Sequence, residues 1–221
     1  MQSMSYHDHL LKLAAIIYRS GKDDVDCLLA TFAADLIREG HRIGGVVQHN
    51  VAGATGAHDK MRLIDLMTGR PISICQPLGR HSQSCRLDPG GIAEAAISVS
   101  RAIADDVELV VVNKFAKQES AGGGLRAEII DAVTAGLPII TTVPETCYDA
   151  WMEFTGGFGT TLLCERGVID AWWREMSWRE SRARLLDRVQ NTLGPTMLPG
   201  APSDRSNVVV LRATSLANHN V

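Results

Sequence analysis

The sequence lacks the cysteine spacing of zinc ribbons and redox motifs, because none of its five cysteines forms a CxxC pair. The number of cysteines is odd, so a framework of paired disulfides has little support. No apolar run approaches the ~20 residues that a membrane-spanning helix needs. The N-terminal stretch also lacks the small-residue cleavage site of a signal peptide. We therefore expect a reduced, cytoplasmic chain without a membrane partner.

An excess of charge of either sign is also missing, since 22 basic residues face 25 acidic ones in a chain of net charge -3. This balance argues against a nucleic-acid partner and against binding to a membrane surface, although it leaves room for a local basic pocket. The 221 residues, 45% of them hydrophobic, are typical of one domain. We expect a single domain over 1–192 and a poorly ordered tail over 193–221, where Pro, Ser and Asn are frequent.

Apolar runs alternate with segments of helical periodicity along most of the chain. The expected strands cover 13–18, 42–48, 108–113, 137–143 and 159–164, the expected helices cover 24–39, 91–104, 125–135 and 168–192, and a hairpin covers 61–75 with its turn near 68–69. The segments 49–59 and 76–89 read as loops. This alternation predicts an α/β fold with a mainly parallel, twisted sheet, helices on both faces and one antiparallel hairpin.

Ligands of open parallel sheets bind beyond the carboxyl ends of the strands. The segment 109–126, LVVVNKFAKQESAGGGLR, leaves such an end. The glycines let backbone amides approach a ligand at the start of a helix, and Lys114, Lys117 and Arg126 add positive charge. The segment predicts a site for phosphate or another oxyanion at Gly122–Gly124. The alternative is an exposed flexible loop with a solvated charge run.

The loop RSGKDD, residues 19–24, occupies the place of a P-loop after the first strand. A P-loop needs GxxxxGK[ST], but Asp23 stands where the hydroxyl residue belongs. Lys22 remains a candidate ligand. An ordinary turn in which Asp23 or Asp24 caps the following helix is the favoured interpretation.

The loop 76–89 contains two arginines, Arg80 and Arg86, that are able to bind an oxyanion in forked geometry. Cys85 beside Arg86 is a candidate reactive thiol, although most free cysteines only fill space. The spacing of His81, Cys85 and Asp88 matches no strong metal template. Asp88 is also the expected N-cap of the next helix, with Pro89 in its first turn.

The aromatic residues near the C-terminus, Trp151, Phe154, Phe158, Trp172, Trp173 and Trp178, are most typical of core. An alternative role is to stack a flat ring, for which Trp151 and Phe154 are the best candidates. Exposed members of this set are compatible with a homodimer.

Two motifs in the sequence resemble those of a bacterial family of uncharacterised proteins often encoded beside molybdate-transport genes. Residues 113–119 and 122–126 resemble the family signature NKFGKxE…GxGLR, and residues 85–89, CRLDP, resemble its second motif. The similarity extends from Leu13 to about Trp173. That family is remotely similar to P-loop nucleoside-triphosphatases.

The resemblance implies a P-loop-like fold but not a competent triphosphatase. On that comparison Asn113 stands where the magnesium-binding Asp would be, and Lys114 stands where the catalytic Glu would be. Glu119 keeps a later acidic position, and Ala116 replaces the usual Gly. Phosphoryl transfer needs magnesium held by a carboxylate and phosphates held by the P-loop lysine, and the sequence keeps neither clearly.

We therefore expect a binding protein for a small anionic ligand: a nucleotide, with or without magnesium, molybdate, or a molybdenum-cofactor species. The molybdenum part comes from the resemblance alone. One alternative is an active magnesium-dependent nucleoside-triphosphatase that uses Asp23, Asp24 or Glu119, and another is a non-catalytic partner subunit. The candidate ligand-binding residues are Lys22, Arg80, Cys85, Arg86, Asn113, Lys114, Lys117, Glu119, Gly122, Gly123, Gly124 and Arg126.

Overall fold

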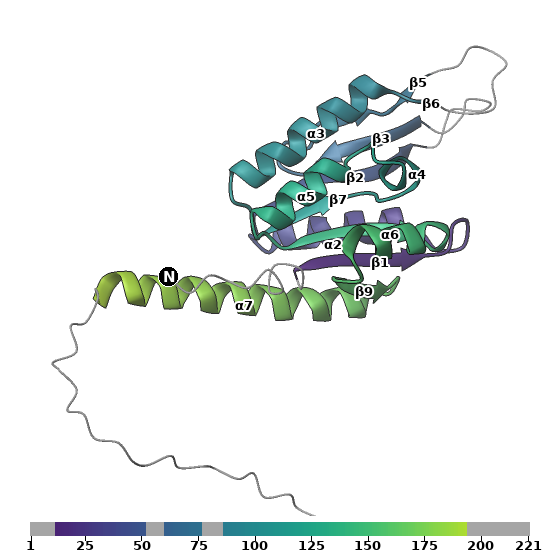
Figure 1. Ribbon diagram of the computed structural model, residues 1–221. Helices are drawn as coiled ribbons and strands as arrows, with labels where there is room; N and C mark the ends of the chain where they lie inside the picture. The colour runs from purple at the N-terminus through teal and green to yellow at the C-terminus, as the bar shows by residue number, and fades with distance from the viewer. Residues whose placement is uncertain (1–11, 52–59, 77–85, 194–221) are drawn as a thin grey trace, which may run out of the picture. The chain divides into compact units, whose positions relative to one another are not determined.

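The computed structural model describes residues 12–51, 60–76 and 86–193 (Figure 1). Its strands are β1 (Leu13–Tyr18), β2 (Ile43–Val51), β3 (Lys60–Asp65), β4 (Pro71–Ser73), β5 (Cys75–Gln76), β6 (Arg86–Leu87), β7 (Leu109–Val112), β8 (Ile139–Pro144) and β9 (Thr160–Leu163). Seven of them form one sheet in the order β4-β3-β2-β7-β8-β1-β9, and β5 pairs with β6 in a separate antiparallel ribbon.

The five strands from β2 to β9 in this order are parallel, and the hairpin adds two antiparallel pairings. β3 runs against β2 and β4 runs against β3, so β4 points the same way as β2. The segment after β4 therefore leaves at the carboxyl edge of the parallel strands. The predicted fold class, a mainly parallel sheet with one antiparallel hairpin, is confirmed.

Helices cover both faces of the sheet (Figure 1). They are α2 (Val25–Arg38), α3 (Pro89–Ala104), α4 (Lys117–Ser120), α5 (Arg126–Thr134), α6 (Tyr148–Thr155) and α7 (Arg166–Leu193), with a 3-10 turn η1 (Glu145–Cys147). Leu13 and Ala15 of β1 pack with side chains from α3, α5 and α6, whereas Ala14 and Ile16 pack with α2 and α7. Alternation of side chains along a strand thus divides the core into two layers.

Two predicted helix starts are confirmed by their caps. The Asp24 side chain accepts a hydrogen bond from the Cys27 amide at 3.2 Å, and α2 follows. The Asp88 side chain accepts one from the Gly90 amide at 3.2 Å, and α3 begins at Pro89. In each case a carboxylate satisfies an amide that has no partner within its own helix.

The helices α4 and α6 were not predicted, and both predicted loops overlap strands: 49–59 overlaps β2, and 76–89 overlaps β5 and β6. α4 has four residues and α6 has eight, and helices this short depend on packing rather than on their own periodicity. The predicted loop from residue 49 is wrong at its start, because β2 continues to Val51 in register with β3. Pairing with the hairpin extends β2 beyond what its own composition indicates.

Most of the tryptophans lie in the core, as predicted. Trp151, Trp172 and Trp173 are buried, whereas Trp178 is 57% exposed and Phe158 is 41% exposed. Trp151 and Phe154 pack against Phe115, with ring centroids 5.1 and 5.2 Å from it, and neither lines the cavity described below. The alternative of a ring-stacking role for these two is not supported.

The expectation of fully reduced cysteines is wrong at Cys75. This residue is disulfide-bonded, and its partner is not among the described residues. Spacing along the sequence could not reveal this, because the pairing of β5 with β6 draws together the two ends of the segment between them. Cys27, Cys147 and Cys164 are free thiols, and burial raises the pKa of the Cys164 thiol.

Contacts divide the chain into two units, Met1–Ser181 and Arg182–Val221. The first unit contains the whole sheet, and the described part of the second is the end of α7. The boundary expected at residue 192 stays a prediction, and the expected tail lies almost wholly outside the described residues. Among those residues, no helix combines the length and the apolar character needed to cross a bilayer.

Candidate ligand-binding site

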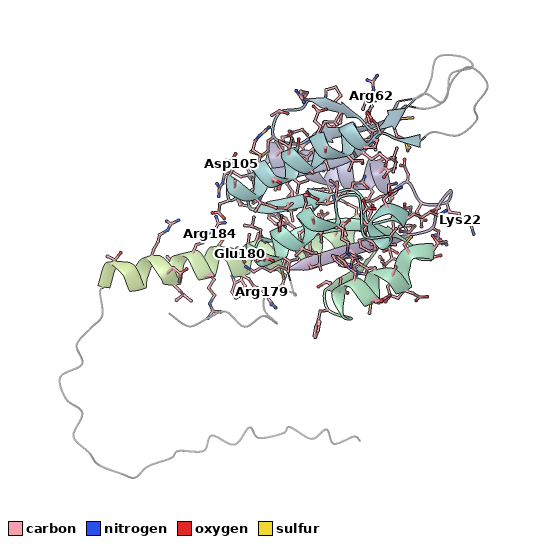
Figure 2. All side chains as sticks on the ribbon, turned by 45° about the horizontal axis from the view of Figure 1, so that its top comes forward. Lys22, Arg62, Asp105, Arg179, Glu180 and Arg184 are labelled. Atoms are coloured by element: carbon pink, nitrogen blue, oxygen red, sulfur yellow. The ribbon has the colours of Figure 1, made fainter. Side chains whose placement is uncertain are left out.

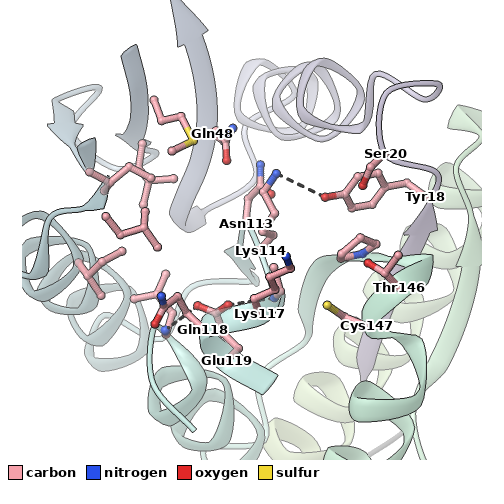
Figure 3. Close-up of a pocket in the computed structure, with 18 residues that line it drawn as sticks. Tyr18, Ser20, Gln48, Asn113, Lys114, Lys117, Gln118, Glu119, Thr146 and Cys147 are labelled. Atoms are coloured by element: carbon pink, nitrogen blue, oxygen red, sulfur yellow. Dashed lines mark hydrogen bonds between the residues drawn. The ribbon is translucent and has the colours of Figure 1, made fainter. Parts of the chain in front are cut away.

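A cavity of about 580 Å3 opens at the carboxyl edge of the sheet (Figure 3). Tyr18 ends β1, Pro144 ends β8 and Asn113 follows β7, and all three line it. The chain leaves β1 through α2 toward β2, and it leaves the neighbouring β8 through α6 toward β9, on the opposite face. The cavity thus lies at a topological switch point, the usual place for ligands in such sheets.

Asn113 is fixed at the inner end of the cavity. It is 2% exposed, and its Nδ2 donates to Oδ1 of Asp26 at 3.0 Å. Thr142 Oγ1 donates to Asn113 Oδ1 at 2.8 Å. A neutral amide, hydrogen-bonded to α2 and β8, therefore stands at the position that the family resemblance assigns to a magnesium-binding carboxylate.

Lys114 carries a positive charge that is partly compensated. Its Nζ lies 3.4 Å from Oδ1 of Asp26, in the first turn of α2, and donates to the Tyr18 hydroxyl at 3.5 Å. The same Nζ lies 5.6 Å from the centre of the Tyr18 ring. The Lys114 side chain keeps 24% of its surface exposed, so it remains accessible from the cavity.

Lys117 carries the second charge of the cavity wall. It is the first residue of α4, is exposed and lines the cavity, as does Lys114 (Figure 3). Within residues 12–51, 60–76 and 86–193, no carboxylate forms an ion pair with it. The structure therefore brings together Asn113, Lys114 and Lys117, three of the residues that the sequence singled out.

Glu119 also lines the cavity, but its carboxylate braces the backbone. Oε2 accepts from the Ala116 amide at 2.9 Å, and Oε1 accepts from the Leu125 amide at 3.1 Å. The side chain is 6% exposed. Glu119 thus ties together the Ala116 and Leu125 backbone on the two sides of α4, the short helix that begins at Lys117.

Two of the three glycines of this segment use their amides within the turn and not toward the cavity. The Gly122 amide donates to Glu119 O at 3.1 Å, and the Gly123 amide donates to Gln118 O at 2.9 Å. Neither residue lines the cavity. Their amides are already hydrogen-bonded to carbonyls of the same turn. Gly124 lines a smaller neighbouring cavity of about 340 Å3, together with Leu87, Pro89, Ile92 and Gln118.

Arg126 is likewise turned away from the cavity. Its guanidinium carbon lies 4.2 Å from the centre of the Phe154 ring, and its Nη1 donates to Glu119 O at 3.1 Å. Stacking on an aromatic ring satisfies this charge inside the fold. Arg126 is therefore not among the residues that line the cavity, and its contact with a ligand stays a prediction.

The loop after β1 is an ordinary closed turn, as favoured. The amides of Lys22 and Asp23 both donate to Arg19 O at 3.1 Å, and Asp23 Oδ1 lies 2.9 Å from Nη2 of Arg19. Hydrogen bonds from Arg19 lower the pKa of Asp23. Lys22 is exposed and projects from the edge of the molecule (Figure 2), whereas Ser20 lines the cavity. The structure does not bring Lys22 into the site.

The middle loop reaches the cavity through the end of β6. Arg80 and Cys85 lie outside the described residues, and the side chain of Arg86 is also outside the description. The next residue, Leu87, lines the cavity. The contribution predicted for Arg80, Cys85 and Arg86 therefore stays a prediction.

The apolar wall of the cavity was not predicted from the sequence. This wall comes from the hairpin, β6, α3 and the start of α5, and consists of Met61, Leu63, Ile74, Leu87, Ile92 and Leu125. The places of Tyr18, Gln48, Thr146 and Cys147 in the lining, and of Asp26 beside it, were not predicted either. Tyr18 could have been found as the last residue of a predicted parallel strand, whereas Asp26 has no signal beyond its place in the first turn of a helix.

The fold is that of an α/β protein with a cavity at a switch point of its sheet, an architecture consistent with that of P-loop nucleoside-triphosphatases. The chain belongs to the family described as "Protein of unknown function (DUF2478)", which matches residues 13–172. It is 58% identical over 173 residues to a protein of Bradyrhizobium diazoefficiens named "Molybdenum import ATP-binding protein ModC 2". That similarity covers 78% of this chain and 19% of the relative, so the chain spans about a fifth of its length.

Proposed function

We propose that this protein binds a small anionic ligand, a nucleotide or a molybdenum-bearing species, without hydrolysing triphosphates. The observation that carries the proposal is a cavity at the switch point of the sheet with Lys114 and Lys117 in its wall. A volume of about 580 Å3 lies within the usual range for small-molecule sites.

The charges around the cavity favour an anion. The Asp26 carboxylate is engaged by Lys114 and Asn113, and the Glu119 carboxylate is engaged by two amides. Lys117 thus carries a positive charge that no carboxylate among the described residues pairs with. At 4 Å and an effective dielectric constant of about 20, its attraction for a unit negative charge is about 4 kcal/mol before desolvation.

Molybdenum and ATP enter through the relative and the family resemblance, not through the residues of the cavity. The relative's name refers to molybdenum import and to ATP binding. Because the similarity covers 19% of that protein, its whole activity does not transfer to this chain. Molybdate, a molybdenum-cofactor species and a nucleotide are therefore the ligands to test first.

The turn after β1 supports binding without turnover. Two amides of this turn already donate to Arg19 O, so they do not point at a phosphate. The Asp23 carboxylate is paired with Arg19, so it is not available to hold magnesium. Asp24 caps α2, and Asp26 is paired with Lys114. Among the described residues, no group of three His, Cys, Asp or Glu side chains is placed to hold a metal ion. These residues do not fit a protein-held magnesium site.

A thermal-shift panel on the full chain tests the proposal, with ATP, GTP, GMP, molybdate, tungstate and phosphate as probes. A probe at a hundred times its dissociation constant stabilises the folded state by about 2.7 kcal/mol. We expect at least one anion to raise Tm, and this shift to shrink with added salt. Release of inorganic phosphate from ATP or GTP, measured in parallel with magnesium, would instead favour the triphosphatase.

Lys117→Ala is the informative variant and Arg188→Ala its control, since Arg188 is an exposed residue of α7 that does not line the cavity. Both changes remove one positive charge. We expect Lys117→Ala to lose most of the ligand-induced shift and Arg188→Ala to keep it. Equal shifts in both variants, or no shift with any anion, would contradict the proposal.

The exposed apolar face of α7 favours a second candidate role in protein association. Leu185, Leu186 and Val189 are 60%, 51% and 45% exposed. Such side chains are typical of contact surfaces when they gather on one helix. Light scattering after size-exclusion chromatography distinguishes a homodimer from a monomer. If the chain is a dimer through this face, Leu185→Glu should halve the measured mass.

A further inference from the structure

The cavity has two walls of different chemistry. The apolar wall consists of six side chains from the hairpin, β6, α3 and the start of α5: Met61, Leu63, Ile74, Leu87, Ile92 and Leu125. The polar wall consists of the two lysines with Tyr18, Ser20 and Thr146. Figure 3 shows Gln48 between the unlabelled apolar side chains and the polar group around Asn113.

A bare oxyanion fits this arrangement poorly. The volume of a tetrahedral oxyanion is close to that of a few water molecules, each of which occupies about 30 Å3. It would leave most of the roughly 580 Å3 to water, in contact with Met61, Leu87 and Ile92, which are only partly buried. Apolar surface of this kind favours a ligand that covers it, because burial removes it from water.

We propose that the ligand is an organic anion, a flat heteroaromatic ring that carries a phosphate. The ring lies along the wall formed by Leu87 and Ile92, and the phosphate lies at Lys117 and Lys114. This inference rests on the proposed function and narrows its ligand class. Nucleotides and pterin phosphates share this chemistry, and the experiment below separates them.

The polar group between the walls suits such a ligand. Gln48 is 7% exposed and Asn113 is 2% exposed, so their amides are held in fixed positions at the inner end of the cavity. Beyond its hydrogen bonds to Asp26 and Thr142, the Asn113 amide has a second N–H and a second oxygen lone pair, and these match the polar edge of a heterocycle. A simple alkyl phosphate has no such edge.

Isothermal titration of the full chain provides the test, with GMP, 6-hydroxymethylpterin monophosphate, guanosine, inorganic phosphate and molybdate as probes. We expect at least one organic phosphate to bind tenfold or more tightly than both inorganic anions and than guanosine. Tenfold in affinity corresponds to about 1.4 kcal/mol. The preference between GMP and the pterin phosphate identifies the source of the ring.

Ile92→Ala tests the apolar wall, and Ile97→Ala is its matched control. Ile97 lies on the same helix, is 61% exposed and does not line the cavity. We expect Ile92→Ala to weaken the organic phosphate about five- to tenfold and to leave phosphate and molybdate unchanged, whereas Ile97→Ala changes neither. Lys117→Ala should weaken the organic phosphate and not guanosine. Circular dichroism and urea midpoints check that each variant is folded.

The outcomes separate this inference from the proposed function. If molybdate or phosphate binds as tightly as the better organic phosphate, and Ile92→Ala weakens no probe, the ring-binding inference is wrong while anion binding stands. If guanosine binds as tightly as GMP, the lysines do not hold the phosphate and the inference is also wrong. If none of the anions binds, both ideas are wrong.

Discussion

Lys114, which lines the cavity, forms an ion pair with Asp26, Nζ to Oδ1 at 3.4 Å. The two residues come from segments far apart in the sequence, the loop after β7 and the first turn of α2. The Asp26 carboxylate lowers the attraction of Lys114 for a second anion, because the pair already shares its charge. The pair therefore sets how much positive charge a ligand meets.

Replacement of the two partners should change anion affinity in opposite directions. Asp26→Asn keeps the shape of the side chain and an acceptor for Asn113, but removes the negative charge, so we expect a several-fold lower dissociation constant for the anion. Lys114→Ala should raise the dissociation constant about tenfold. Isothermal titration at low salt measures both. A loss of affinity in Asp26→Asn similar to that in Lys114→Ala would show that the pair matters only as structure.

Gly124→Ala should destabilise the protein more than Gly122→Ala. Both glycines have positive φ, +60° and +90°, which disfavours alanine at each. A Cβ on Gly124 would overlap the carboxylate of Glu119, whereas a Cβ on Gly122 would meet open space. We expect a free energy of unfolding lower by about 1–2 kcal/mol for Gly122→Ala and by at least about 1 kcal/mol more for Gly124→Ala. Urea titration measures the difference, and equal losses would contradict the proposed brace by Glu119.

Phe115→Ala should strongly destabilise the protein. Phe115 is fully buried and packs against Trp151 and Phe154. Removal of a buried aromatic side chain lowers the free energy of unfolding by about 3–5 kcal/mol. Phe158→Ala is the control, because Phe158 is 41% exposed and should lose about 1 kcal/mol or less. Thermal unfolding followed by tryptophan fluorescence compares the two, and similar losses would contradict the packing described.

Asp35 should contribute stability that is lost in acid. Hydrogen bonds from Arg166 come first among the causes that lower its pKa, and the charge of Arg38 adds to them. A carboxyl whose pKa is lower in the folded than in the unfolded chain stabilises the fold above its unfolded value, about 3.9 for Asp. This contribution disappears as the pH falls through the lower folded value.

We therefore expect Asp35→Asn to be modestly less stable than the native chain at pH 7 and closer to it at about pH 2.5. Urea midpoints at the two pH values measure the gap. A gap that is as large at pH 2.5 as at pH 7 would show that Asp35 acts through its shape and not through its charge.

Several features of the site could be predicted because they depend on local sequence. The apolar run before Asn113 indicates a parallel strand, so Lys114 and Lys117 had to follow a carboxyl end, where ligands bind. Asp23 in place of a hydroxyl residue was enough to favour a plain turn over a P-loop. The direction of the glycine amides was not predictable, since it depends on which carbonyls the turn satisfies by itself.

The α/β class, the strands that end at the cavity and the two lysines that follow one of them can be derived from the residues in order, because strand and helix periodicity are local properties. The pairing of Asp26 with Lys114, the stacking of Arg126 on Phe154 and the apolar wall from the hairpin depend on how the folded chain packs. These contacts join segments separated by tens of residues, and burial selects among them only when the whole core packs. The same packing places apolar and positively charged groups in one cavity.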